Sequence, residues 1–168
     1  MLHKDLSRIR GQELKRACEE ARVEAIREFE LLKYEPLFIA GLMLYWGEGD
    51  KVTRHRVRLT NTDPQMIKLF ARFLVIICNI SFERMQAQLL LYPDLSDTEL
   101  KKYWSDATEL PESSFRKTTI IQGRHPTKRL EQGICIILVS SVYLKIKILE
   151  WIHLSAKQLI DDKGCENI

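Results

Sequence analysis

The sequence predicts an α+β domain in which helices cover one face of a single antiparallel sheet. Segments with apolar residues at spacings of three and four follow one another along the chain with short segments of strict polar and apolar alternation. The alternating segments have one apolar side and one side of Arg, Gln or Thr, which is typical of a sheet covered on one face only. With 168 residues, 45% of them hydrophobic, the chain can build one core but not two full-sized domains.

The first expected helix spans residues 5–33. Apolar or small side chains recur along it at helical spacing, namely Leu14, Cys18, Ala21, Ala25, Phe29 and Leu32. Glu35-Pro36 ends this helix, because the residue before a proline disfavours the helical conformation. Residues 1–35 carry eight Lys or Arg and eight Asp or Glu, so their charges cancel. We expect residues 1–35 to form an amphipathic helical arm, residues 36–160 the main domain and residues 161–168 a frayed tail.

The main domain follows in sequence order. In residues 54–59 three Arg alternate with His, Val and Leu, which predicts a strand with its guanidinium groups on one face. Asp63-Pro64 predicts the cap and first turn of the next helix. The pattern as a whole predicts helices over residues 37–47, 64–78, 94–107 and 141–159, and strands over residues 54–59, 83–92, 115–122 and 134–139.

The basic residues of the main domain gather in two stretches. Residues 51–62 hold four Lys or Arg, residues 113–130 hold five, and neither stretch contains a carboxylate. Two local basic surfaces on a chain of formal charge +3 suit the binding of a polyanion to one face. Solvated basic strands or loops are the alternative interpretation.

Residues 38–50 form the most informative segment, Phe-Ile-Ala-Gly-Leu-Met-Leu-Tyr-Trp-Gly-Glu-Gly-Asp. This strongly apolar helix contains Gly41 and Gly47, and because glycine inside a helix costs about 1 kcal/mol relative to alanine, the pair suggests close approach of another helix. Glu48 stands at the helix C-terminus, where the helix dipole disfavours a carboxylate and a bound divalent cation would reverse that penalty. Gly49 suits a left-handed turn after the helix. The alternative is a core helix that ends at a surface glutamate.

The helix–acid–glycine segment resembles the motif of LAGLIDADG homing endonucleases, with Glu48-Gly49 at the closing Asp-Gly. Residues 39–42, the basic strand and the Asn61–Pro64 helix start are also similar to standalone members, so the resemblance covers about residues 36–155. It implies that two motif helices pack about a two-fold axis, that their carboxylates hold metal ions over the scissile phosphates, and that a saddle-like sheet lies on the DNA. Because the chain holds one such motif, the resemblance implies a homodimer that uses Mg²⁺ or Mn²⁺.

The implied activity is site-specific cleavage of double-stranded DNA by phosphodiester hydrolysis. A catalytically silent DNA-binding regulator and an RNA splicing maturase remain open as alternatives. The chain departs from the family in two places: the family's central glycine falls on Met43, two residues after Gly41, and the hairpin that usually follows the motif is shortened.

The expected site residues follow from the motif and from strand parity. Glu48 is the expected metal ligand and, with Lys145, the expected catalytic residue. Arginine pairs with guanine edges and glutamine with adenine edges, so a face with both residue types suits the major groove. The expected dimer contact is Ala40, Leu44 and Gly47, and the expected DNA contacts are Lys51, Arg54, Arg56, Arg58, Arg84, Gln86, Gln88, Arg116, Lys117 and Gln122.

Other classes of protein are disfavoured. The chain has no window of about 18 apolar residues and no apolar signal segment, so we expect a cytoplasmic protein without a membrane partner. Its four cysteines are scattered, without a Cys-x-x-Cys pair, which predicts reduced thiols. No glycine-rich phosphate loop and no Ser–His–Asp arrangement is apparent, and we expect no organic cofactor.

Overall fold

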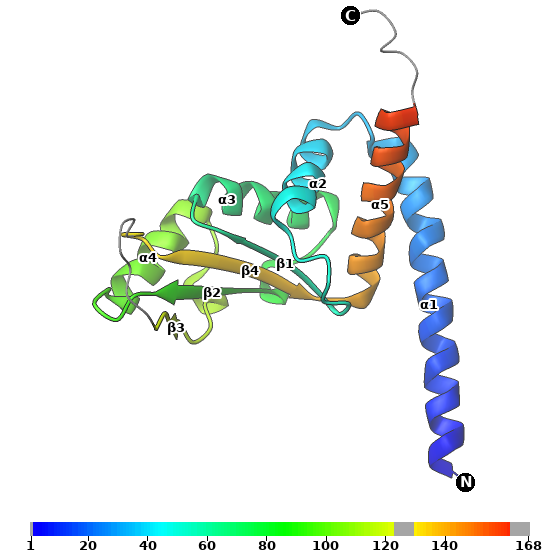
Figure 1. The fold of residues 1–168 in the computed structure, drawn as a ribbon, viewed down its shortest axis with the longest axis horizontal. Helices are drawn as coiled ribbons and strands as arrows, with labels where there is room; N and C mark the ends of the chain where they lie inside the picture. Colours follow the sequence, from blue (N-terminus) through cyan, green and yellow to red (C-terminus); the bar gives the residue numbers. More distant parts are fainter. Residues whose placement is uncertain (1, 123–129, 162–168) are drawn as a thin grey trace, which may run out of the picture.

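The computed structural model describes residues 2–122 and 130–161, with side chains described from residue 10 to residue 160 of those ranges (Figure 1). Within them the chain is an α+β structure of five α-helices, three short helical turns and a four-stranded sheet. The elements in chain order are α1 (Leu2–Leu32), α2 (Pro36–Glu48), β1 (Arg56–Asn61), α3 (Pro64–Arg72), a π-helical turn η1 (Phe73–Ile77), a 3₁₀ turn η2 (Phe82–Arg84), β2 (Met85–Leu91), α4 (Asp97–Thr108), a second 3₁₀ turn η3 (Glu112–Ser114), β3 (Thr119–Ile120), β4 (Ile134–Ser140) and α5 (Val142–Asp161).

The sheet has the strand order β1-β4-β2-β3 and is mixed, not antiparallel as expected. Strand β4 pairs antiparallel with both β1 and β2, whereas β2 and β3 are parallel. The parallel pair arises because the chain crosses over through α4 and η3 before it enters β3, as parallel neighbours require. The strand expected over residues 115–122 is reduced to Thr119–Ile120, and much of the connector after it, residues 123–129, lies outside the described residues.

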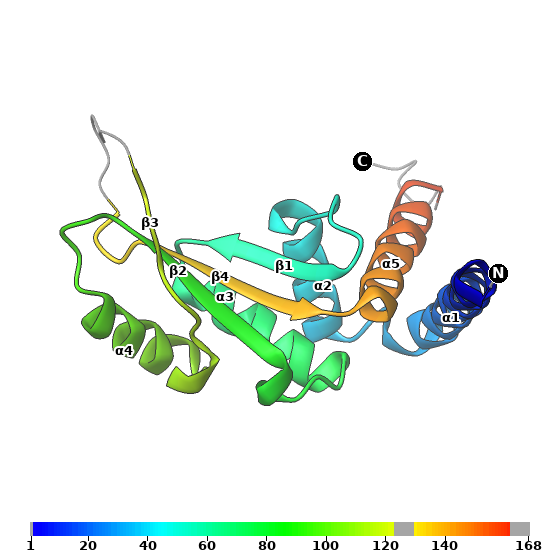
Figure 2. The ribbon, with the colours of Figure 1, turned by 90° about the horizontal axis from the view of Figure 1, so that it is seen from below.

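Helices pack on one face of the sheet, as the sequence predicts. Val57 and Leu59 of β1 and Met85, Ala87 and Leu89 of β2 are buried on that face, which confirms the predicted strand parity. Helices α2 and α3 lie over these strands (Figure 1), and Figure 2 shows the opposite face turned to the viewer with α3 behind the sheet.

A row of aromatic side chains joins the helices above the sheet. Tyr45 of α2 stacks on Phe70 of α3, with ring centroids 5.6 Å apart, and Phe70 stacks on Phe73 at 5.7 Å. Trp151 of α5 makes edge contacts with Phe73 and with Phe38 of α2. The apolar stripe predicted for the closing helix is therefore buried in the same core as the motif helix.

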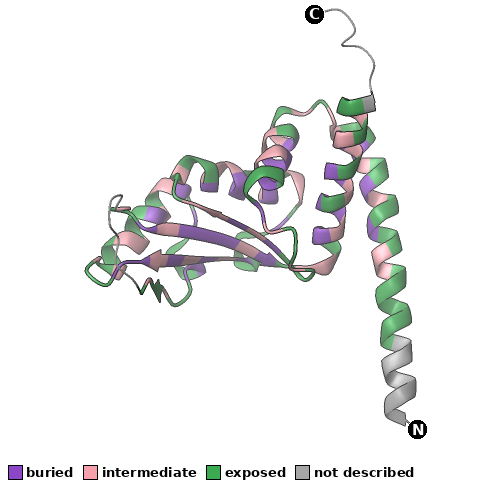
Figure 3. Cartoon of the chain, in the orientation of Figure 1, coloured by how far each residue is buried: buried purple, intermediate pink, exposed green. Residues whose placement is uncertain are grey.

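Helices α1 and α5 run side by side at one end of the sheet (Figure 1). Ala21, Ala25 and Phe29 of α1 are buried there, and the Trp151 indole N–H donates to the Ala25 carbonyl at 3.0 Å. Among the side chains described from residue 10 onward, the buried positions of α1 begin at Ala21, and the N-terminal part of the helix extends past the start of α5 (Figure 3). Among the described residues, no helix combines the length and the hydropathy that a membrane crossing requires.

Candidate nucleic-acid interface

The uncovered face of the sheet brings together arginines and glutamines from strands far apart in the sequence. Arg58 of β1 and Gln86 of β2 both lie opposite Leu138 of the central strand β4, so the two side chains share a face. Arg56 shares it by parity, and Gln88 lies opposite Ile136 on the same face. Neighbouring strands lie about 4.8 Å apart, so the arginine and glutamine rows are separated by about 10 Å. The face therefore carries four of the six residues that the sequence predicts for it on β1 and β2, namely Arg56, Arg58, Gln86 and Gln88.

Gln88 connects this face to the edge strand β3. Its amide nitrogen donates to the Lys117 carbonyl and to the Thr119 hydroxyl, both at 3.0 Å. Both of its N–H groups are therefore used within the protein, and an adenine edge needs a donor as well as an acceptor from glutamine. In this arrangement Gln88 positions the exposed Lys117 at the sheet edge, and Gln86 is the glutamine left to contact a base.

Several other expected DNA contacts lie outside the strands. Arg54 stands in the exposed turn before β1. Lys51 is also exposed, and its ammonium donates to the Trp46 carbonyl at 2.7 Å, across the end of α2. Arg84 belongs to η2, because β2 begins at Met85, two residues later than the expected strand. It lines a cavity of about 400 Å³ beside α1 and α5 instead of joining the glutamine row.

Arg116 and Gln122 flank the short edge strand β3, and both are exposed. The Arg116 main-chain N–H donates to the Ala87 carbonyl at 2.7 Å, which joins the residues before β3 to β2. The basic residues of the connector after Gln122, Arg124, Lys128 and Arg129, lie outside the described residues. The described part of the face thus has a basic edge on β1 and a second one at β3.

Glu48 is the last residue of α2, and its side chain is exposed. It makes no hydrogen bond or ion pair with any residue that the structure describes, so its carboxylate is available to a ligand. Gly49 then leaves the helix in an extended conformation (φ −76°, ψ 151°), not in the left-handed turn expected from the sequence. Glycine is required there for a different reason, because a Cβ atom would lie 2.4 Å from the Tyr45 ring.

Asp50 is the other acidic side chain at this turn, and its carboxylate is hydrogen-bonded to neighbouring groups of the protein. Its carboxylate accepts from the Thr53 hydroxyl at 2.6 Å and from the main-chain N–H groups of Val52 and Thr53. Arg58 lies 3.2 Å away from it. These hydrogen bonds, with that of the Thr53 side chain foremost, lower the pKa of Asp50 to about 2. Asp50 therefore orients Arg58 and holds the turn in place.

Lys145 of α5 lies beneath the same turn and is only 1% exposed. Its ammonium donates to the Tyr45 hydroxyl at 2.7 Å and to the Asp50 carbonyl. Burial lowers the pKa of Lys145, while the nearby Asp50 carboxylate opposes that shift. The Lys145 ammonium is thus directed at the protein's own turn, where it links α5 to the end of the motif helix.

The two glycines inside α2 occupy different environments. Gly41 is buried, and a Cβ atom there would lie 2.3 Å from the Phe73 ring, so the close approach that the sequence predicts takes place within the chain. Gly47 is exposed, and a Cβ atom there would meet no atom within 4 Å. Of the expected dimer contact, Ala40 and Leu44 are half-buried. The outer side of α2 carries exposed or partly exposed apolar and small residues, namely Ile39, Ala40, Met43, Trp46 and Gly47.

A scan against protein-family models, a search of curated proteins and a search of solved structures each give no match to this chain. Within the described part of the chain, no three His, Cys, Asp or Glu side chains gather as a metal site. At the end of α2, each chain offers one carboxylate, that of Glu48, as a ligand for a metal ion. A single carboxylate suits Mg²⁺, which keeps several waters and takes phosphate oxygens of the substrate as further ligands.

Two features of this region are not evident from the sequence, one on the uncovered face and one in the core. The central strand β4 places Ile136 and Leu138 on the uncovered face, so an apolar strip separates the arginine and glutamine rows. The unbroken apolar run of residues 134–139 is the signal that could have indicated a central strand. The burial of Lys145 has no comparable signal, because a lysine in an amphipathic helix is ordinarily exposed.

Proposed function

We propose that the chain binds double-stranded DNA on the uncovered face of its sheet. The observation that carries the proposal is the strand register, which gathers Arg56, Arg58 and Gln86 on the face opposite the helices. Arginine and glutamine side chains provide the hydrogen bonds that base edges present in the major groove. Leu138 of β4, which is half-buried between them, suits contact with a thymine methyl group. Lys117, at the far edge, supplies a cation for the phosphate backbone.

We further propose that the DNA is cleaved, by a homodimer whose two Glu48 carboxylates each serve one strand. Glu48 is exposed at the end of α2, has no partner among the residues that the structure describes, and lies next to the turn that orients Arg58. A divalent cation bound there would lower the pKa of an attacking water and stabilise the leaving oxygen. Lys145 and Asp50 act as positioning residues, since both hold the turn that follows Glu48.

The homodimer would form through the outer side of α2. Ile39 and Trp46 are 42% and 37% exposed on this helix although their side chains are large and apolar. Gly47 presents no side chain, so a second α2 helix can approach the backbone closely, and a two-fold arrangement places both Glu48 residues near the axis. These features also support the saddle-like dimeric fold implied by the resemblance to LAGLIDADG endonucleases.

Cleavage is tested by incubating the purified protein with a randomised plasmid library and Mg²⁺. Linear product that disappears in Glu48→Gln supports the endonuclease. The matched control is Glu112→Gln, which removes an exposed carboxylate from η3 on another part of the chain and should leave cleavage unchanged. Equal cleavage by Glu48→Gln and the parent would reject Glu48 as the metal ligand.

A DNA-binding regulator without cleavage is the second candidate. The observation that favours it is the uncovered face itself, since base contacts from β1 and β2 do not depend on Glu48. Sequence-selective binding with no cleavage in either Mg²⁺ or Mn²⁺ would establish this function. A clear preference for folded RNA over duplex DNA would instead support the splicing maturase.

A further inference from the structure

The N-terminal half of α1 is basic, and its C-terminal half is acidic. Residues 2–18 carry five Lys or Arg and two Asp or Glu, whereas residues 19–35 carry three and six. The charges of the arm, which cancel over its whole length, are therefore separated along the helix. A separation of this kind creates a local field that the net charge of the arm does not reveal.

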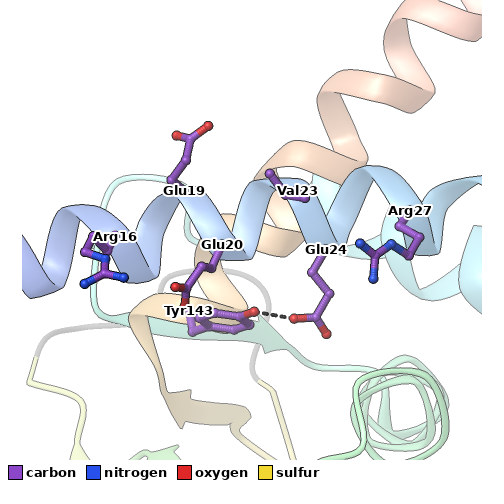
Figure 4. A pocket seen from close by; sticks show the side chains of 7 residues that line it. All are labelled: Arg16, Glu19, Glu20, Val23, Glu24, Arg27 and Tyr143. Carbon is purple, nitrogen blue, oxygen red and sulfur yellow. Dashed lines mark hydrogen bonds between the residues drawn. The ribbon is translucent and has the colours of Figure 1, made fainter.

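The change of sign coincides with the place where α1 leaves the body of the protein. Glu20 and Glu24 point from α1 toward Tyr143, the second residue of α5 (Figure 4). These side chains line a cleft of about 490 Å³. The Tyr143 hydroxyl donates to Glu24, and the Lys147 ammonium lies 2.9 Å from the same carboxylate. These contacts lower the pKa of Glu24 to about 2, with the Tyr143 hydrogen bond as the largest cause. The acidic half of α1 is thus the part that packs on α5.

The basic half projects beyond the sheet on the side of its uncovered face. In Figure 1 α2 and α3 lie above the strands, whereas α1 continues below them to its N-terminus. Figure 2, seen from below, shows the uncovered face and the N-terminus of α1 both toward the viewer. At 1.5 Å per residue, the residues of α1 that precede Glu20 extend about 27 Å past the start of α5. The arm therefore stands beside any ligand that lies on the sheet.

The cations of the arm are available to such a ligand. Arg10, Lys15 and Arg16 are exposed, and none of them forms an ion pair with a described residue. Arg10 lies on the same side of the helix as Ala21 and Ala25, because positions 10, 14, 21 and 25 are separated by four, seven and four residues. Ala21 and Ala25 face α5, and α5 stands between α1 and the sheet (Figures 1 and 2). Beyond the start of α5, this side of the helix is turned toward the space in front of the uncovered face.

We propose that residues 10–18 of α1 form a phosphate-binding arm that contacts the backbone of duplex DNA bound on the uncovered face. The inference rests on the proposed DNA binding and adds a second contact surface to it. Lysine and arginine side chains bind phosphates irrespective of sequence, and each neutralised phosphate releases counterions. The arm would therefore contribute affinity and salt dependence, whereas the strands would contribute sequence preference.

The test compares three double variants of the full chain by fluorescence anisotropy with a mixed-sequence DNA duplex across a salt series. Arg10→Gln/Lys15→Gln neutralises the projecting part of α1. Arg22→Gln/Arg27→Gln removes the same charge from the part of the helix that packs on α5, and Arg56→Gln/Arg58→Gln removes it from the uncovered face. Of these six residues, all but Arg58 are exposed, and circular dichroism checks that each variant keeps the parent fold.

The expected result is that Arg10→Gln/Lys15→Gln weakens binding and reduces the slope of log K against log salt by about one to two, because Arg10 is on the side of the helix turned toward the face and Lys15 is on its flank. Arg22→Gln/Arg27→Gln should leave both unchanged. If only Arg56→Gln/Arg58→Gln weakens binding, the arm proposal is overturned and DNA binding by the sheet stands. If neither Arg10→Gln/Lys15→Gln nor Arg56→Gln/Arg58→Gln weakens binding, the arm proposal and the proposed DNA binding by the sheet are both overturned. A photo-cross-linking amino acid incorporated in place of Leu14 should also label the duplex, whereas the same amino acid in place of Leu31, at the other end of α1, should not.

Discussion

Replacing Gly41 by alanine should destabilise the protein, although alanine is the better helix former. The new Cβ atom would lie 2.3, 2.4 and 2.5 Å from three atoms of the Phe73 side chain, far inside ordinary van der Waals contact. Phe73 cannot easily move, because it is fully buried between the Phe70 ring and the Trp151 ring. Overpacking of this kind costs about 1–3 kcal/mol, and helix propensity returns about 1 kcal/mol. Because all three contacts are shorter than 3.0 Å, we place the overpacking cost in the upper part of that range, at about 2–3 kcal/mol, and expect a net loss of about 1–2 kcal/mol.

The assay is thermal unfolding of Gly41→Ala beside Gly47→Ala, two identical substitutions in one helix. A loss of 1–2 kcal/mol corresponds to a decrease of about 2–8 °C in the melting temperature for a chain of this size. Gly47→Ala should leave the melting temperature of the monomer unchanged or slightly raised, because no atom lies within 4 Å of the added Cβ. Equal melting temperatures for the parent and Gly41→Ala would refute the packing described here. The double variant Gly41→Ala/Phe73→Leu should recover part of the loss.

Three further predictions concern the turn after α2, the α1–α5 contact and the dimer. The pKa of Asp50 is lowered to about 2 from an ordinary 3.8, so its ionised form contributes about 1–2 kcal/mol to the free energy of unfolding above pH 4, and this contribution is lost as the pH falls toward 2. Urea unfolding at pH 4 and pH 2 should therefore show that Asp50→Asn loses less stability on acidification than the parent. Lys147→Met should lower the free energy of unfolding by about 2–3 kcal/mol in chemical denaturation, because it leaves the Glu28 carboxylate, 2.7 Å from the ammonium, without its partner. Lys147→Met/Glu28→Gln should be less destabilised than Lys147→Met, and equal destabilisation of the two variants would show that the pair is not coupled. Gly47→Leu should convert the proposed dimer to a monomer in sedimentation experiments by steric overlap between the two α2 helices, and a parent protein that is monomeric at micromolar concentration with DNA present would reject that interface.

The sequence predicts local features of this fold well and long-range ones poorly. The alternation of Arg56 and Arg58 with Val57 and Leu59 determines which side chains share a face, because strand periodicity depends on adjacent residues only. The Asp63 cap is confirmed for the same reason, since its carboxylate accepts from the Gln65 main chain two residues later at 2.8 Å. The order of the strands in the sheet, in contrast, depends on contacts between residues far apart in the sequence.

The mixed sheet and the buried Lys145 illustrate what local patterns omit. The pairing of β3 with β2 depends on a crossover through α4, and nothing in residues 115–122 indicates its direction. Lys145 is buried because Tyr45 and Asp50, about 100 residues earlier in the sequence, provide its acceptors. Gly41 is intermediate between these cases: its helix suggests close packing, but the structure alone identifies Phe73 as the partner.

The central claim, that DNA binds the uncovered face of the sheet, is tested most directly by duplex affinity in a matched pair of charge-neutralised variants. Arg56→Gln/Arg58→Gln removes two cations from that face, and Arg72→Gln/Lys102→Gln removes two from exposed positions of α3 and α4 on the helical side. We predict weaker binding for the first variant only, because it removes two cationic hydrogen-bond donors from the proposed contact with the bases. Equal affinity of the first variant and the parent, with both folded by circular dichroism, would contradict the claim.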